Sequence, residues 1–201
     1  MDIRPDLLTP PATGGGERAD AARNRAKILA AAAELFTGRD PRAVTMDDIA
    51  KAAGVGRGTL YRRYPDIGAI AMALLDDHER ALQEQLLGGA PPLGPGAPPA
   101  ERLAAFYAAM VELLDAHADL VLGAESGEAR FATGAYGFWS AHVRALLVAA
   151  GVARPDVLVD VLLAPVAVEV YRHQRHRGLG SAQITAALAD LAHAVIASAA
   201  S

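Results

Sequence analysis

Apolar residues recur every three or four positions through most of the chain, and this helical spacing constrains the fold more than any other feature. Alanine, a strong helix former and a poor strand former, dominates the 52% of residues that are hydrophobic, whereas aromatic residues make up only 5%. No segment alternates between apolar and polar side chains as a half-buried strand would. We therefore expect an all-α fold.

Glycine and proline divide this pattern into helical segments. Pro165 should kink a long apolar segment because it lacks the backbone N–H of a helix interior. Ser181 is placed to cap the last helix, and the Pro/Gly run at residues 88–99 should form a loop or hinge. The expected helices cover residues 20–38, 45–54, 57–64, 66–87, 100–122, 125–131, 134–150, 156–172 and 181–198.

The chain as a whole carries a net charge of −4, but its charge is unevenly distributed. Residues 21–65 hold nine Lys and Arg residues against four acids, whereas residues 66–201 hold eight Arg residues against fifteen acids. A basic N-terminal segment on an acidic body indicates a nucleic-acid partner more strongly than the net charge does.

Composition also excludes several classes of protein. The absence of cysteine rules out disulfides, thiolate zinc sites and cysteine nucleophiles, and it fits a cytoplasmic location. No uncharged apolar run is long enough for a transmembrane helix. Residues 1–20 carry prolines, three consecutive glycines and no apolar stretch, so we expect a flexible tail and not a signal peptide.

Residues 45–64 have the spacing of a helix-turn-helix. Thr45 is a suitable N-cap, and Asp48 three residues later completes a capping box. Ala50 is small where the second helix must approach, and Gly54 allows the positive φ of a tight turn. Leu60 follows six residues after that glycine and fills the small core between the helices.

The second helix of this motif would present a polar, basic face to DNA. Arg57 is placed to reach guanine O6 and N7 in the major groove, and a phosphate contact is the alternative. Hydroxyl groups of Thr45, Tyr61 and Tyr64 can contact phosphate oxygens. The expected DNA-facing residues are Thr45, Arg57, Gly58, Thr59, Tyr61, Arg62, Arg63 and Tyr64.

Several motifs, in the same order, resemble the TetR family of transcriptional regulators. They lie at residues 25–36, 45–50, 53–55, 58–61 and 63–65, so the resemblance spans residues 21 to about 82. Two positions depart from the family pattern. Ile67 and Gly68 replace a phosphate-contacting lysine, and Gly56 replaces a serine; Arg62 and Arg63 are placed to compensate.

The resemblance implies a homodimer that binds a palindromic operator with its third helix in the major groove. It also implies dimerisation through the last two helices and a pocket for a small-molecule effector. We accordingly expect a tail at residues 1–20, a helix-turn-helix DNA-binding domain at residues 21–82, and a ligand-binding and dimerisation domain at residues 83–201.

The candidate pocket residues are mostly aromatic and include one methionine. The alternative interpretation is that they simply pack in the hydrophobic core. They are Phe106, Met110, Tyr136, Trp139 and His142. His173 and His176 lie three residues apart on one helix face and could in principle bind a metal. Cationic side chains at a helix C-terminus are also favoured by the helix dipole, and this explanation needs no metal. No catalytic constellation is visible, so we expect no enzyme activity, no cofactor and no metal site.

The function we expect is a repressor released from its operator by a small molecule. An effector-independent architectural DNA-binding protein is one alternative, and its C-terminal half would be fully packed. A helical adaptor whose basic segment binds an acidic partner is another. A cavity of a few hundred Å³ would favour the effector-responsive regulator.

Overall fold

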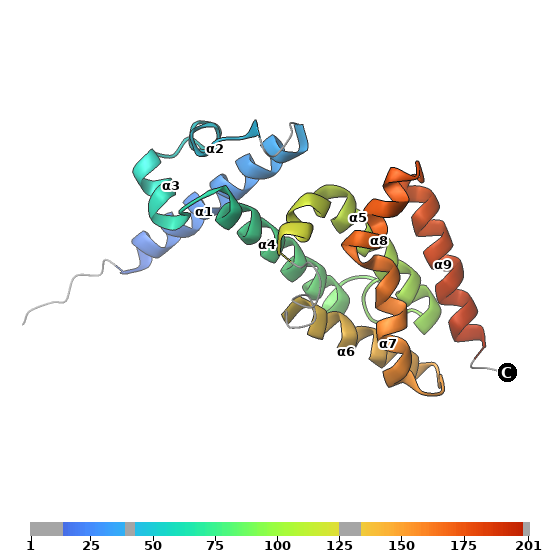
Figure 1. Cartoon of the computed structure of the whole chain (residues 1–201). Helices are drawn as coiled ribbons and strands as arrows, with labels where there is room; N and C mark the ends of the chain where they lie inside the picture. Colours follow the sequence, from blue (N-terminus) through green and yellow to red (C-terminus); the bar gives the residue numbers. More distant parts are fainter. Residues whose placement is uncertain (1–13, 39–42, 125–133, 199–201) are drawn as a thin grey trace, which may run out of the picture. The chain divides into compact units, whose positions relative to one another are not determined.

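The computed structural model describes residues 14–38, 43–124 and 134–198, in which every regular element is a helix (Figure 1). This confirms the all-α fold. The chain divides into two compact units, Met1–Ile70 and Ala71–Ser201. The division lies within helix α4 (Ile67–Gly88), earlier than the expected boundary at residue 82. None of these helices combines the length and the apolar composition that a membrane span needs.

Three helices build most of the first unit: α1 (Gly14–Gly38), α2 (Met46–Ala53) and α3 (Arg57–Arg63). Helix α1 starts before the expected position at Asp20, so residues 14–20 are helical and not part of a tail; residues 1–13 lie outside the described residues. The buried side chains that join these helices include Ile28, Ala32, Val44, Ile49, Leu60 and Tyr64.

The start and end of α2 match the sequence expectation. The backbone N–H of Thr45 donates to Asp48 Oδ2 at 3.0 Å, and the backbone N–H of Asp48 donates to Thr45 Oγ1 at 3.2 Å. Gly54 ends the helix in the left-handed region, with φ 64° and ψ 33°. The N–H of Val55 then donates to the carbonyl of Ala50 at 3.1 Å, which closes the turn between α2 and α3.

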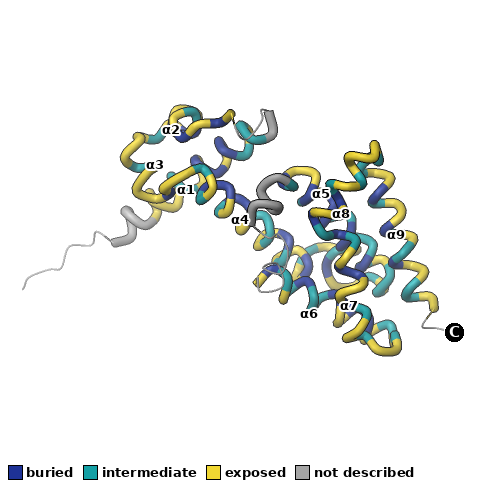
Figure 2. The backbone as a smooth tube through the Cα atoms, viewed as in Figure 1, coloured by how far each residue is buried: buried dark blue, intermediate teal, exposed yellow. Residues whose placement is uncertain are grey.

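Helix α5 (Pro99–Ala124) organises the second unit. Helices α9 (Ser181–Ala197), α6 (Gly134–Ala149) and α8 (Val168–His176) pack against it, and α7 (Pro155–Leu163) packs against α6 (Figure 1). Buried and exposed positions alternate around these helices (Figure 2), as the helical spacing of apolar residues requires. The buried hydroxyl of Tyr107 donates to the carbonyl of Leu162 at 2.9 Å and ties α5 to α7.

The Pro/Gly run between α4 and α5 forms consecutive turns, as expected. It is nevertheless packed, because Leu93 lies against the core of the second unit and Gly94 is buried. A Cβ at Gly94 would lie 1.9 Å from the carbonyl oxygen of Gly89. The close approach of two backbone segments therefore requires glycine at this position.

The expected kink at Pro165 is instead a complete break, and the expected cap at Ser181 is wrong. Helix α7 ends at Leu163, a 3₁₀ turn, η3, covers Ala164–Val166, and Ala167 is extended with φ −67° and ψ 139° before α8 begins. Proline cannot donate to the carbonyl four residues earlier, so the helical ladder stops there. Ser181 is the first residue of α9; Gln183 Oε1 accepts from the N–H of Gly180 at 2.9 Å.

The expected short helix at residues 125–131 lies outside the described residues. Helix α5 itself departs from helical geometry at His117, where φ is −138° and ψ is 16°. His117 Nε2 lies 2.5 Å from His78 Nδ1 of α4, and this hydrogen bond requires one ring to donate and the other to accept. Burial, followed by the charge of His78, lowers the pKa of His117 to about 4.

A second histidine of this unit is shielded in the same way. The ring of His142 lies 5.5 Å from that of Phe106, measured between centroids. Burial, followed by the charge of Arg102, lowers the pKa of His142 to about 4. Both histidines are therefore neutral in the folded protein at neutral pH.

We expect Gly54→Val to lower the free energy of unfolding of the first unit by about 1–3 kcal/mol, because a β-branched residue resists positive φ. A Cβ at Gly54 would meet nothing within 4 Å, so the loss would be conformational and not steric. Denaturant titration measures it. Gly58→Ala in α3, where a Cβ also meets nothing within 4 Å, is the matched control and should not destabilise the protein. Equal stability of Gly54→Val and wild type would contradict this account of the turn.

We expect acid to destabilise the second unit through His117 and His142. Their folded pKa values lie below the ordinary value of about 6.5, so the unfolded chain binds protons that the folded chain excludes. Stability is therefore lost as pH falls from about 6.5 towards 4, by at most about 1.4 kcal/mol per pH unit for each histidine. Denaturant titrations between pH 6.5 and 5 should show that the free energy of unfolding depends less steeply on pH for His117→Gln combined with His142→Gln than for wild type.

Candidate nucleic-acid interface and effector cavity

Most of the expected DNA-facing residues are accessible on one short helix and the turn before it. Arg57, Gly58, Arg62 and Arg63 are exposed, Thr59 is half-buried, and the side chain of Tyr61 is 50% exposed although it is large and aromatic. Leu60 is fully buried and anchors α3 on α2. The polar side of α3 is thus left free for a partner, while its apolar side holds the helix in place.

Arg57 begins α3 directly after the N-cap Gly56. Its guanidinium pairs with the carboxylate of Asp47, which lies in the first turn of α2. Both side chains remain accessible, at 71% for Arg57 and 49% for Asp47. The sequence reasoning identified Arg57 and missed Asp47, because ten residues and a turn separate the two.

The other two arginines of α3 contact backbone carbonyls. Arg62 Nε donates to the carbonyl of Gly58 at 3.2 Å, within the same helix. Arg63 Nη1 donates to the carbonyl of Ala21 in α1 at 3.0 Å. The charges of both side chains stay exposed, and the two contacts direct them to different sides of α3.

Thr45 and Tyr64 have structural roles in addition to their expected contacts. The Thr45 hydroxyl donates to Asp48 Oδ2 at 2.6 Å and accepts from the Asp48 N–H, so it is part of the capping box. Tyr64 is only 6% exposed, and its ring belongs to the core of the first unit. Phosphate contacts from these two hydroxyl groups stay predictions.

The start of α4 is capped by an acid and carries no basic residue in its first turn. Asp66 Oδ1 accepts from the N–H of Ala69 at 2.8 Å, and Ile67 and Gly68 occupy the positions where a lysine was expected from the resemblance. The first turn of α4 therefore offers no basic side chain for a phosphate contact.

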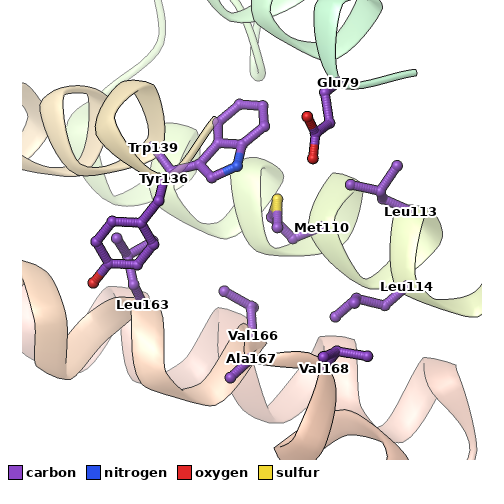
Figure 3. Close-up of a pocket in the computed structure, with 10 residues that line it drawn as sticks. All are labelled: Glu79, Met110, Leu113, Leu114, Tyr136, Trp139, Leu163, Val166, Ala167 and Val168. Carbon is purple, nitrogen blue, oxygen red and sulfur yellow. The ribbon is translucent and has the colours of Figure 1, made fainter. Parts of the chain in front are cut away.

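The second unit contains a partly open cavity of about 50 Å³ among α4, α5, α6, α7, η3 and α8 (Figure 3). Apolar and aromatic side chains form nearly all of its lining, and Glu79 of α4 is the charged residue among them. The lining residues are Glu79, Met110, Leu113, Leu114, Tyr136, Trp139, Leu163, Val166, Ala167 and Val168. The cavity is smaller than the few hundred Å³ that a drug-sized ligand fills.

The structure brings together three of the five predicted pocket residues. Met110, Tyr136 and Trp139 line the cavity, and Figure 3 places Trp139 and Tyr136 on the same side of it. Phe106 and His142 do not line this cavity; they lie against each other in the core of the same unit. The Tyr136 hydroxyl donates to Asp160 Oδ1 at 2.7 Å, which fixes the ring at the cavity wall.

Sequence reasoning missed Glu79, although the sequence carried a signal for it. The apolar stripe of α4 runs through Leu75, Leu82 and Leu86, all buried, and Glu79 lies at the same helical spacing between Leu75 and Leu82. A carboxylate within an apolar stripe is unusual enough to mark a polar feature of the interior. Val166, Ala167 and Val168 were not predicted to line a cavity. They do so because the helix breaks at this point, and the sequence pattern did not predict a complete break.

His173 and His176 lie in the exposed last turn of α8 together with Arg175. Arg175 Nη2 lies 3.7 Å from Asp115 Oδ1 of α5, and the hydroxyl of Tyr171 also donates to that carboxylate. Basic side chains at this helix end interact favourably with the helix dipole.

Comparison with known proteins relates the first unit to a bacterial family. Residues 28–74 match the family model described as "Bacterial regulatory proteins, tetR family". The HTH-type transcriptional regulator Rv1255c of Mycobacterium tuberculosis is 43% identical over 61 residues, which are 30% of this chain and 30% of that protein. The match therefore spans about a third of the relative's length.

Solved structures extend the likeness to the fold of the rest of the chain. A transcriptional regulator of the TetR/AcrR family from Thermobifida fusca has a TM-score of 0.64 at 21% identity, covering 84% of this chain and 95% of that one. NalD of Pseudomonas aeruginosa, a repressor of the MexAB-OprM multidrug efflux pump, has a TM-score of 0.52 at 18% identity, covering 90% and 98%. Residues 28–74 therefore match the tetR family of bacterial regulatory proteins, and the solved structures share the all-α fold of most of the chain.

Proposed function

We propose that the chain is a DNA-binding transcriptional regulator, a repressor that a small molecule releases from a palindromic operator. The observation that carries this proposal is the exposed, arginine-bearing face of α3, set by a capped α2 and the Gly54 turn. A short helix held in this way fits a major groove, where arginine reads guanine and hydroxyl groups contact phosphate.

The second unit supports the release half of the proposal through its cavity. The cavity is apolar with one carboxylate, which suits an organic effector more than a metabolite with several charges. At about 50 Å³ it holds only a few heavy atoms, so a larger effector would extend out of the cavity or move the surrounding helices apart. Helix α4 provides Glu79 to the cavity and begins in the DNA-binding unit, so movement of α4 would change the spacing of two recognition helices.

The two alternatives make different predictions in binding assays. An architectural DNA-binding protein would bind duplexes with little sequence preference, and no small molecule would release it. An adaptor for an acidic partner would not bind DNA selectively at all. Selecting fragments of genomic DNA on the purified protein, followed by mobility-shift assays on the recovered duplexes, separates these cases. Enrichment of one inverted-repeat sequence supports the regulator.

We expect Arg57→Ala to weaken binding of the selected operator by about 1–3 kcal/mol, since a bidentate contact with guanine would be lost. Arg57 is 71% exposed, so the fold and the melting temperature should not change. Titration of the labelled operator at fixed salt measures the effect. Arg80→Ala, which removes the same charge from an exposed side chain of the second unit, is the matched control. Equal affinity of Arg57→Ala and wild type would show that another face of the unit contacts DNA.

We expect a homodimer in solution, joined through α7, α8 and α9. Val157 and Val161 of α7 are 67% and 60% exposed and lie one helical turn apart, and Val170 of α8 is 39% exposed. Alanines 186, 187 and 194 leave an exposed face of α9 open to close approach. Apolar side chains on adjoining helices are better satisfied by a two-fold copy than by water.

Light scattering at micromolar concentration should give twice the chain mass of 20.8 kDa. Val157→Glu combined with Val161→Glu should shift the protein towards monomer, whereas Leu87→Glu, at an exposed leucine of α4, should not. A wild-type mass near that of a single chain would refute the dimer and, with it, recognition of a palindrome.

A further inference from the structure

The ion pair between Asp47 and Arg57 places an acid at the surface that is proposed to approach DNA. Asp47 belongs to the first turn of α2, and Arg57 is the first residue of α3, so the pair joins the two helices of the motif across the Gly54 turn. An acid close to phosphates weakens DNA binding by charge repulsion. A carboxylate at this position lowers the affinity for DNA, so we looked for a contribution to recognition that offsets this loss.

Asp47 pairs with one of the three arginines of α3, and the other two make different contacts. Arg62 and Arg63 donate to neutral backbone carbonyls, whereas the guanidinium of Arg57 is held by a charge. The carboxylate of the neighbouring Asp48 has another role, because it accepts from both the N–H and the hydroxyl of Thr45 in the capping box. Arg57 is thus singled out at the end of α3 where base contacts are expected.

The contact leaves Arg57 able to read a base. Arginine has five N–H donors on two edges, and Asp47 Oδ2 is bonded to the terminal nitrogen Nη2. A bidentate contact with guanine O6 and N7 uses two parallel N–H groups on one edge, so one edge stays available while the carboxylate is bound. A free arginine side chain would lose rotamer entropy when it becomes ordered, and prior fixation lowers that loss on binding.

We propose that Asp47 is a positioning residue that orients Arg57 towards a base edge and disfavours its contact with phosphate. The inference rests on the proposed DNA-binding function and deepens it. Asp47 lowers the affinity for DNA of any sequence by its charge and raises the discrimination at the base pair that Arg57 reads. The simple alternative is an exposed ion pair that contributes nothing measurable to recognition.

The test compares sequence discrimination among variants of the full chain. The probes are the operator selected with the wild-type protein, its complete set of single-base-pair variants, and a random-sequence duplex. Dissociation constants are measured at fixed salt for wild type, Asp47→Asn, Arg57→Ala and the double variant. Thermal melting checks the fold of each variant, and Asp47→Ser serves as a second neutral substitution if Asp47→Asn melts early.

We expect Asp47→Asn to bind the random-sequence duplex more tightly than wild type. It should also lose about tenfold discrimination at one base pair of each half-site and less than twofold at the others, in line with the value of one bidentate contact. The same substitution in the Arg57→Ala background should not change discrimination, because Asp47 acts through Arg57. Asp47→Glu keeps the carboxylate and should restore most of the discrimination. Glu34→Gln, at an exposed acid of α1, is the matched control for charge and should leave discrimination intact.

Three results would overturn the inference. They are undiminished discrimination by Asp47→Asn, a loss spread evenly over all base pairs, and an equal loss in the Arg57→Ala background. If Arg57→Ala loses discrimination while Asp47→Asn keeps it, the proposed function stands and only the role of Asp47 fails. If the wild-type protein selects no sequence, the proposed function fails first and the role of Asp47 falls with it.

A measurement without DNA tests the contact itself. The Nη2–H resonances of Arg57 in the nitrogen-15 spectrum should be slower to exchange with solvent in wild type than in Asp47→Asn. The Arg63 resonance, held by the carbonyl of Ala21, should be the same in both proteins. An Arg57 resonance that does not respond to the substitution would show that Asp47 does not hold this side chain in solution, which also overturns the inference.

Discussion

The left-handed turn at Gly54 is the constraint on which the DNA-binding unit depends. With φ at 64°, it reverses the chain between two helices of eight and seven residues, neither of which is long enough to be stable alone. Leu60 can reach the core beside Ile49 only if the turn holds this geometry. The capping box at Thr45 fixes the start of α2, so both ends of that helix are determined before any contact with DNA.

Because the apolar side of α3 is anchored in the core, its polar side faces one direction. The intramolecular contacts of the three arginines then determine the orientation of their side chains. Arg62 and Arg63 donate to backbone carbonyls, and Arg57 pairs with a carboxylate. The positively charged side chains of α3 are therefore already partly ordered in the free protein. Ordering before binding lowers the entropy lost on association. The chain is acidic overall, but most of its acids lie outside the first unit, so the exposed face of α3 can still be basic.

Sequence patterns predicted those features that depend on near neighbours. The capping box, the Gly54 turn and the limits of α2 and α3 each involve residues at most six positions apart, and all were confirmed. Two contacts at the candidate sites that were missed join distant segments. Asp47 and Arg57 are ten residues apart, and Tyr136 and Asp160 are twenty-four residues apart. The break after Pro165 needed knowledge of Ala167, whose extended backbone no local pattern at that position indicated.

The same break gives the cavity of the second unit a wall that differs from the others. Val166, Ala167 and Val168 line the cavity at the point where the helical hydrogen bonds between α7 and α8 are already interrupted. Moving this segment outwards breaks fewer backbone hydrogen bonds than moving an intact helix would, so it is the wall that can yield to a ligand larger than about 50 Å³. A ligand shifts the protein only by the difference between its affinities for the narrow and the widened cavity. The proposed release from DNA therefore requires that widening the cavity and moving α4, which lines it with Glu79, belong to one conformational change.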